Sequence, residues 1–288
     1  MVFDFNNLAS DIKKTNDKKE KIVIGALKYI AIKEAFELEM PLYENQIFRK
    51  YFTDFYNLPG GAFSAPIMQE TFYRLFQSVR ELYNKKYYGC ELFKNIAIII
   101  STVAGDSEKS FPSKILHTLD NDSPIIDNNV LRGLNLKSSK NPYEDLCKEY
   151  FFSSIKFKNE YLGGANGLLA IAKKELLDDK FNSLCADYLC EKIKPISKVY
   201  KTKIKNIIKD ICIINNRKSN KCVCDMLKGK TAVEDFFDKT TNLVDILNDL
   251  TSKLGLDLKR EIYEISLVKK IDFYLWAKFS KKGDKDND

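Results

Sequence analysis

The chain has 288 residues, of which 44% are hydrophobic and 30% charged, a composition typical of a globular protein. Its 47 basic and 40 acidic residues give a net charge of +7, which permits nucleic-acid binding without requiring it. The single histidine, His117, excludes sites built on a pair of histidines, and the seven cysteines lack Cys-x-x-Cys spacing. We therefore expect free thiols, no metal and no cofactor.

The longest apolar run, residues 96–100, is too short to cross a bilayer. The first residues lack the basic and then apolar pattern of a signal peptide. The sequence therefore predicts a cytoplasmic protein without a membrane partner.

Apolar residues recur at helical spacing through the first part of the chain. The pattern predicts helices over 18–40, 45–56 and 66–83. Residues 90–103 are ambiguous, because their β-branched run would also suit a buried strand, but we favour a helix since the neighbouring segments are helical. A tight turn around Gly105 follows, and the next helix begins after Lys109 because Pro112 suits a first turn.

Asp127 stands just before a short apolar pattern at 128–134, where it would act as the N-cap of a helix. Two helical patterns within 142–179 flank a glycine-rich stretch at 163–167, and two more within 180–215 are divided by Pro195. A polar loop at 215–220 and helical patterns over about 231–254 and 257–279 follow. Alternation typical of strands is nearly absent. The sequence predicts an all-α fold of two helical lobes, 1–140 and 141–280, followed by a charged, disordered tail at 281–288.

The segment from Ser101 to Arg132 resembles the helix-hairpin-helix DNA glycosylase superfamily. It contains a glycine turn at Gly105, a lysine four residues later at Lys109, and then a helix, a loop and Asp127. The resemblance implies that Asp127 is the catalytic carboxylate and that Lys109 is the Schiff-base lysine of the lyase-type members. The chain departs from the family at residues 104 and 107, where alanine and serine replace the preferred proline and glycine.

The chain is also similar to a group of uncharacterised bacterial proteins. The shared patterns are Ser-Lys-x-Leu-His at 113–117, Pro-Ile-x-Asp at 124–127 and Lys-Ile-Asp-Phe-x-Leu-Trp at 270–276. This second likeness spans more of the chain but implies no known activity. We expect His117 to be a packed or hydrogen-bonded residue and Asp272 to pair with a lysine.

Asp127 could stabilise the positive charge that grows on a sugar as its base departs, and could orient the attacking water, without a metal. The structural alternative is that Asp127 only caps its helix. For Lys109 the alternative is a solvent-exposed turn lysine. Both residues are thus catalytic candidates, and for each a purely structural role is the alternative.

Several other residues are candidate nucleic-acid ligands. Backbone N–H groups at Gly105 and Ser107 would hold a phosphate in the hairpin. Lys114 is in the first turn of a helix, where a lysine gains nothing from the helix dipole. Seven lysines between residues 192 and 209 form a basic stretch that could contact phosphates. The alternative interpretation is a helix face exposed to solvent. The predicted side-chain contacts are Lys114, Arg132, Lys198, Lys201 and Lys205.

These observations together predict a DNA glycosylase-like hydrolase that removes a modified or damaged base, as in DNA repair, with DNA as its partner. Two alternatives stay open. One is a non-catalytic DNA-binding protein with a role in defence or regulation, and the other is an all-α protein-interaction module.

Overall fold

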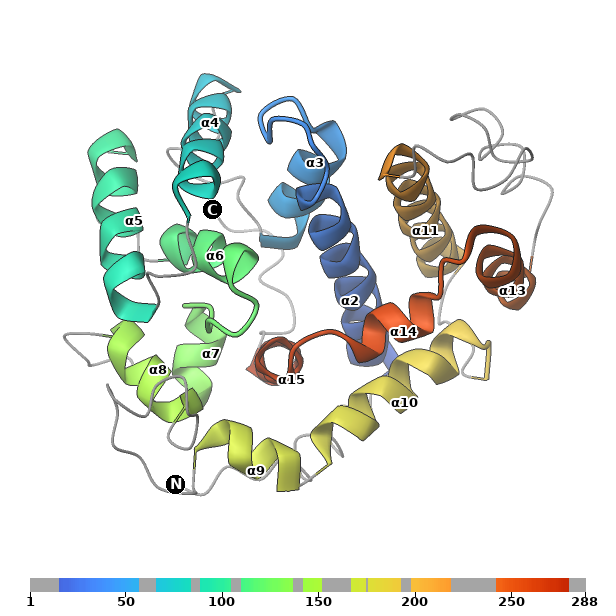
Figure 1. Cartoon of the computed structure of the whole chain (residues 1–288). Coiled ribbons are helices and arrows are strands. Elements are labelled where there is room, and N and C mark those ends of the chain that lie inside the picture. Colours follow the sequence, from blue (N-terminus) through green and yellow to red (C-terminus); the bar gives the residue numbers. More distant parts are fainter. Residues whose placement is uncertain are drawn as a thin grey trace. The chain divides into compact units, whose positions relative to one another are not determined.

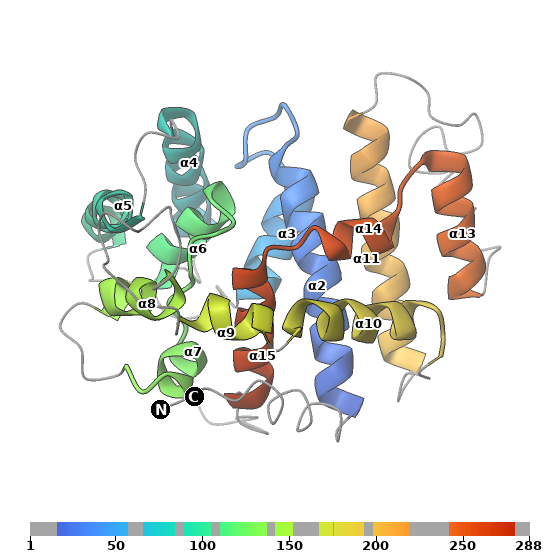
Figure 2. The same cartoon turned by 60° about the horizontal axis from the view of Figure 1, so that its bottom comes forward.

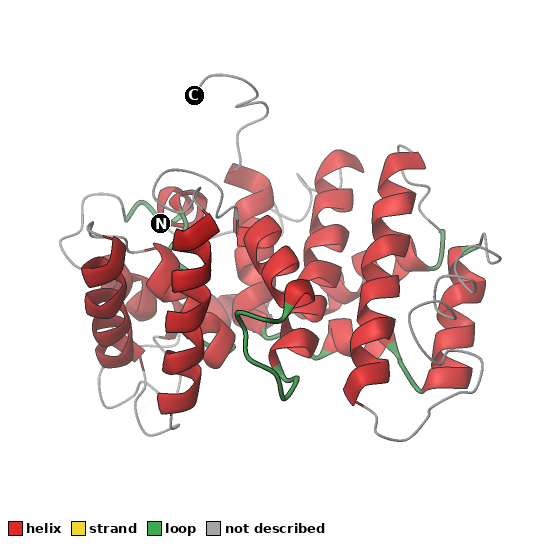
Figure 3. Cartoon of the chain, turned by 90° about the horizontal axis from the view of Figure 1, so that it is seen from above, coloured by secondary structure: helices red, strands yellow, loops and turns green. Residues whose placement is uncertain are grey.

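The computed structural model describes residues 16–56, 66–83, 89–104, 110–136, 142–151, 167–174, 176–192, 198–218 and 242–279. Within these ranges the chain forms thirteen helices and no strand, which confirms the predicted all-α class (Figure 1 and Figure 3). None of the helices in these ranges is long and apolar enough to cross a membrane. The segment at 90–103, ambiguous in sequence, is helical.

The helices belong to two compact units, and each unit is assembled from separate stretches of the chain. Unit 1 takes in Met1–Lys18, Tyr83–Lys180 and Ser266–Asp288, and unit 2 takes in Lys19–Leu82 and Phe181–Ile265. The lobes expected from sequence, 1–140 and 141–280, follow the chain in order, whereas these units alternate along it. The predicted tail, 281–288, lies outside the described residues.

Unit 1 is built around its last helix. Its helices are α5 (Gly89–Ala104), α6 (Ser110–Leu119), α7 (Asn128–Gly133), α8 (Pro142–Phe151), α9 (Leu168–Lys174) and α15 (Leu267–Phe279). Helix α6 packs against α5, and α8 contacts both α5 and α9, while α15 packs against α7 and α9 (Figure 2). This arrangement brings the segment after α6 next to a helix that lies far away in sequence.

Helix α15 is buried around its whole circumference. Every side chain from Val268 to Leu275 is buried, charged residues included, so the helix has no solvated face along this length. Helix α7 approaches it closely because Gly133 has no side chain. A Cβ atom at this position would lie 2.7 Å from Cε2 of Phe279, closer than carbon atoms approach one another.

Unit 2 has an aromatic core. Its helices are α2 (Asn16–Phe36), α3 (Gln46–Tyr56), α4 (Pro66–Leu82), α10 (Leu177–Leu189), α11 (Lys198–Lys218), α13 (Leu243–Leu254) and α14 (Leu258–Tyr263), with the first residues of α2 and α10 assigned to unit 1. Phe48 and Phe52 of α3 stack with ring centroids 5.3 Å apart, and both rings meet Phe76 of α4 edge-on, at 5.6 and 5.4 Å. Such tilted contacts stabilise aromatic clusters beyond the area that they bury.

Several predicted boundaries are wrong. The helix expected over 18–40 runs from Asn16 to Phe36. The closing segment forms two helices, α14 and α15, because Ser266 interrupts it: the Ser266 hydroxyl donates to the carbonyl of Asn121 at 2.7 Å and accepts from the Lys269 N–H at 3.3 Å. The predicted loop at 215–220 is helical as far as Lys218. The Lys218 ammonium pairs with Glu34 at 2.9 Å and with Glu37 at 2.6 Å, which holds the end of α11 against α2.

Candidate functional site

The segment with the glycosylase-like pattern lies in unit 1. Helix α6 begins at Ser110 and has Pro112 in its first turn, as predicted, and it packs against α5. The intervening residues 105–109 lie outside the described residues, and with them Gly105, Ser107 and Lys109. The hairpin itself therefore stays a prediction, while the helices on either side of it are present.

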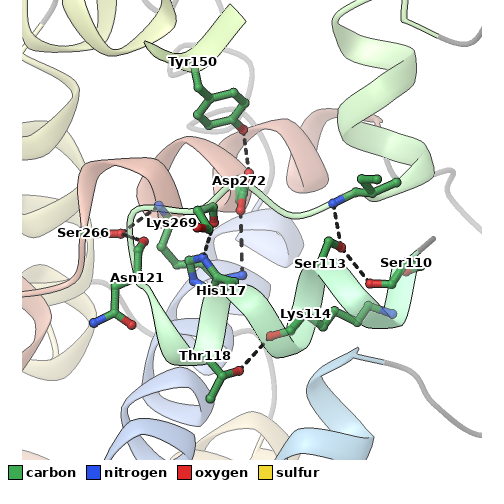
Figure 4. A network of polar contacts seen from close by, with 12 residues as sticks. Ser110, Ser113, Lys114, His117, Thr118, Asn121, Tyr150, Ser266, Lys269 and Asp272 are labelled. Carbon is green, nitrogen blue, oxygen red and sulfur yellow. Dashed lines mark hydrogen bonds and ion pairs between the residues drawn. The ribbon is translucent and has the colours of Figure 1, made fainter. Parts of the chain in front are cut away.

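Two side chains of α6 fix the loop that leads to Asp127. The Ser113 hydroxyl donates to the Ser110 carbonyl at 2.7 Å and accepts from the Ile126 N–H at 2.9 Å (Figure 4). His117 is fully buried, and its Nδ1 lies 2.6 Å from the Ser123 carbonyl oxygen. Because a carbonyl only accepts, Nδ1 carries the proton. The structural role predicted for His117 is confirmed.

Asp127 caps helix α7, as predicted. It has extended backbone angles, φ −130° and ψ 141°, and its Oδ1 accepts from the Asn129 N–H at 2.6 Å. Its side chain is half-buried rather than enclosed. The cap uses one of the two carboxylate oxygens, so Oδ2 remains for another interaction.

Unit 1 also holds a group of buried polar side chains from α8 and α15, within electrostatic reach of Asp127. The Tyr150 hydroxyl donates to Asp272 Oδ1 at 2.5 Å, and the Lys269 ammonium lies 4.0 Å from Asp272 Oδ2 (Figure 4). The side chains of Lys269 and Asp272 are only 5% and 7% exposed. Among the residues that the structure describes, none donates a hydrogen bond to Asp272 Oδ2. An ion pair at the limit of contact distance leaves this buried oxygen poorly compensated.

Burial dominates the protonation of this group. It raises the pKa of Asp272 and lowers the pKa of Lys269, because a charged form loses its hydration in the interior. The negative charge of Asp127 acts on the same groups and raises the pKa of Lys269, of Asp272 and of Tyr150. These four residues, Asp127, Tyr150, Lys269 and Asp272, therefore form one electrostatic unit, which we call the buried charge cluster.

The other predicted ligands have structural contacts of their own. Lys114 is buried, and its ammonium lies 4.9 Å from the ring centroid of Phe111. Figure 4 shows its side chain running along α6 toward Ser110, away from Asp272. Arg132 donates from Nη1 to the Phe279 carbonyl at 3.2 Å, at the end of α15. The predicted phosphate-binding roles of Lys114 and Arg132 stay predictions, with these contacts as the structural alternative.

The structure brings Asp127 together with residues that the sequence did not single out as a site. Asp272 was expected to pair with a lysine, which Lys269 confirms, but neither Lys269 nor Tyr150 was expected beside Asp127. The sequence did contain a signal, since α15 places three charged residues in an apolar stretch that leaves no polar face. The third, Lys270, is fully buried and pairs with Asp178.

Lys198, Lys201 and Lys205 lie on α11 of unit 2, and so not in the unit that holds the buried charge cluster. Lys201 pairs with Glu191 at 2.8 Å. In the part of the chain that the structure describes, no group of three or more acidic, histidine or cysteine side chains gathers as a metal site would require. Comparisons with protein-family models, with curated proteins and with solved structures find no match for this chain.

Proposed function

We propose that unit 1 carries a DNA glycosylase-like site, with Asp127 as its catalytic carboxylate and DNA containing a modified base as its substrate. The observation that supports this most is the electrostatic coupling of the half-buried Asp127 to the buried Lys269 and Asp272. Strongly perturbed ionisable groups cluster at functional sites more often than elsewhere.

The reaction needs one well-placed carboxylate. As the bond between the sugar and the base breaks, the base leaves with the electron pair and positive charge grows on the sugar. An anionic Asp127 would stabilise that charge and accept a proton from water as the water oxygen bonds to the sugar carbon.

Capping alone does not account for the surroundings of Asp127. Asparagine or serine would cap α7 as well as aspartate does. Burying Lys269 and Asp272 removes the hydration of two charged groups, which lowers stability unless their pairing compensates for it. A catalytic role gives a reason for the charged surroundings that a cap does not.

The test is base release from oligonucleotides. Purified protein is incubated with duplex and single-stranded DNA carrying a panel of modified bases, and alkali then cleaves any abasic site. We expect cleavage by the wild type and a loss of about 100-fold or more in Asp127→Asn, in line with the usual contribution of general acid–base catalysis. Asn keeps the cap, so the fold should survive.

A matched control is Asp257→Asn in unit 2. Asp257 caps α14 by accepting from the N–H groups of Lys259 and Arg260, at 3.0 and 3.2 Å, so the same change is made at a cap outside unit 1. Equal activity of Asp127→Asn and wild type would contradict the proposal. Salt-dependent DNA binding without any base release would favour the non-catalytic DNA-binding protein, and neither activity would favour the protein-interaction module.

The lyase role of Lys109 is a separate expectation. Borohydride reduction during the reaction traps a Schiff base as a stable protein–DNA adduct, which Lys109→Ala would abolish if that lysine is the nucleophile. Release of the base without a trapped adduct would assign the protein to the monofunctional class, with Asp127 acting alone.

A further inference from the structure

Trp276, the only tryptophan of the chain, lies in the last turn of α15. From Val268 to Ala277 it is the one residue that is exposed, with 37% of its surface accessible to solvent. Tryptophan has the largest side chain and gains most from burial, and it is enriched where proteins contact their partners. An exposed indole on a helix that is otherwise buried along this stretch is therefore a candidate contact for a ligand.

Trp276 shares a face of α15 with two residues of the buried charge cluster. Lys269, Asp272 and Trp276 follow one another at intervals of four and three residues, which places them in one row along the helix. The first two are buried, so only the end of this row reaches the solvent. Helix α7 packs beside the row, where Gly133 lies against Phe279 (Figure 2). The exposed indole is therefore within one turn of the contact between α15 and α7.

The charged residues at this end of α15 are cations. Arg132 of α7 is exposed, and its Nη1 donates to the Phe279 carbonyl at 3.2 Å, one turn beyond Trp276. A guanidinium has five N–H groups, so this single contact leaves others that can reach an anion. Residues 128–136 and 273–279, which include α7 and the end of α15, contain Arg132 and Lys278 but no acidic residue. An exposed aromatic ring beside cations suits a nucleotide, because the base stacks and the phosphate is anionic.

We propose that Trp276 is a stacking platform for an unpaired base of single-stranded nucleic acid, with Arg132 as the contact to the backbone phosphate. Stacking tolerates any sequence, since every base has an aromatic face. This inference goes beyond the proposed function, because it requires neither a modified base nor catalysis. The exposure of the sole tryptophan and the charge complementarity at the end of α15 support it.

The experiment uses Trp276 as its own probe. Because the chain has one tryptophan, its fluorescence, excited where tyrosine does not absorb, reports on this indole alone. The ligand is an unmodified single-stranded oligothymidylate, and its control is a sugar-phosphate chain of the same length without bases. We expect the oligothymidylate to quench the fluorescence of the full chain, and the base-free chain to bind more weakly and to leave the fluorescence unchanged.

Three variants separate stacking from packing and from charge, with affinity measured by the anisotropy of a labelled oligothymidylate. Trp276→Leu should weaken binding by about 5- to 150-fold, the factor expected for the loss of one stacked base. Trp276→Phe keeps an aromatic face and should retain most of the affinity, whereas a role in packing alone would give both variants the same affinity. Arg132→Gln should lower the slope of log K against log salt by about 0.7, which corresponds to one phosphate contact on a single strand.

A matched control is Tyr263→Leu on α14 of unit 2, which removes an aromatic residue that is 54% exposed and should leave the affinity unchanged. The proposal is overturned if the oligothymidylate does not quench the fluorescence, if the base-free chain quenches it equally, or if Trp276→Leu binds as tightly as the wild type. Fluorescence that changes with protein concentration alone would assign the indole to a contact between copies of the chain and would also overturn it. Base release is scored separately, so stacking without release would reject the role of Asp127 and leave this inference standing.

Discussion

The buried charge cluster allows a quantitative test through Asp272→Leu. The substitution leaves the Lys269 ammonium buried without the Asp272 carboxylate. Breaking a buried pair from one side costs about 3–5 kcal/mol, and a pair whose atoms are 4.0 Å apart should lie at the lower end of that range. It also leaves the Tyr150 hydroxyl, now 2.5 Å from Asp272, without its acceptor, which adds about 1–3 kcal/mol. We therefore expect a loss of about 4 kcal/mol, a large part of the roughly 5–15 kcal/mol that holds a typical domain folded.

Removing all the charges should restore most of this loss. In the variant Tyr150→Phe/Lys269→Met/Asp272→Leu every group that Asp272 compensates becomes apolar with little change in volume. Buried ion pairs replaced in this way usually leave stability within a few kcal/mol of the original. The triple variant should therefore be more stable than Asp272→Leu alone.

Urea unfolding followed by circular dichroism measures the free energy of unfolding of each variant. The explanation fails if Asp272→Leu is as stable as the wild type, or if the triple variant is no more stable than the single one. A matched control is Tyr143→Phe, since Tyr143 is also buried on α8 but stacks on Phe93 at 4.0 Å and lies outside the cluster. That change should cost far less than Asp272→Leu.

Two further predictions concern the same unit. Because burial raises the pKa of Asp272 and lowers that of Lys269, the native state binds the Asp272 proton more tightly than the unfolded chain and the Lys269 proton less tightly. The contribution of Asp272 to the free energy of unfolding should fall as pH rises from 3.8 toward neutrality. The contribution of Lys269 should rise as pH increases from about 8 to 10.5. Urea unfolding over this pH range checks both trends, and the variant Lys269→Met/Asp272→Leu should show neither. Gly133→Ala should cost about 1–3 kcal/mol because its methyl group overlaps the Phe279 ring, and Phe279→Leu added to it should recover part of that loss in thermal unfolding; equal melting temperatures of Gly133→Ala and wild type would contradict this account of the α7–α15 contact.

The features that the sequence predicted correctly are those set by neighbouring residues. Pro112 marks the start of α6, and Asp127 caps α7, because a fixed proline angle and a capping hydrogen bond each involve only a few adjacent positions. Ser266 shows the limit of such reasoning. It ends one helix and begins another partly through a bond to the carbonyl of Asn121, which periodicity in 257–279 could not indicate.

The buried charge cluster is the part of the candidate site that local patterns could not predict. Tyr150, Lys269 and Asp272 come from two helices that are far apart in the chain, so only the tertiary fold places them beside Asp127. Lys114 also shows that local patterns do not determine burial. The sequence predicts Lys114 as a contact to nucleic acid, yet its side chain is buried in unit 1.

The interleaved course of the chain has a consequence for biosynthesis. The last segment of unit 2 ends at Ile265, and the last segment of unit 1 begins at the next residue. A nascent chain that has emerged as far as Ile265 thus possesses every segment of unit 2, whereas α5 to α9 still lack the helix on which α7 and α9 pack. The loop that carries Asp127 has been synthesised long before then, but its surroundings are complete only when α15 leaves the ribosome. Unit 1 is therefore completed later than unit 2, when α15 becomes available to pack against α7 and α9.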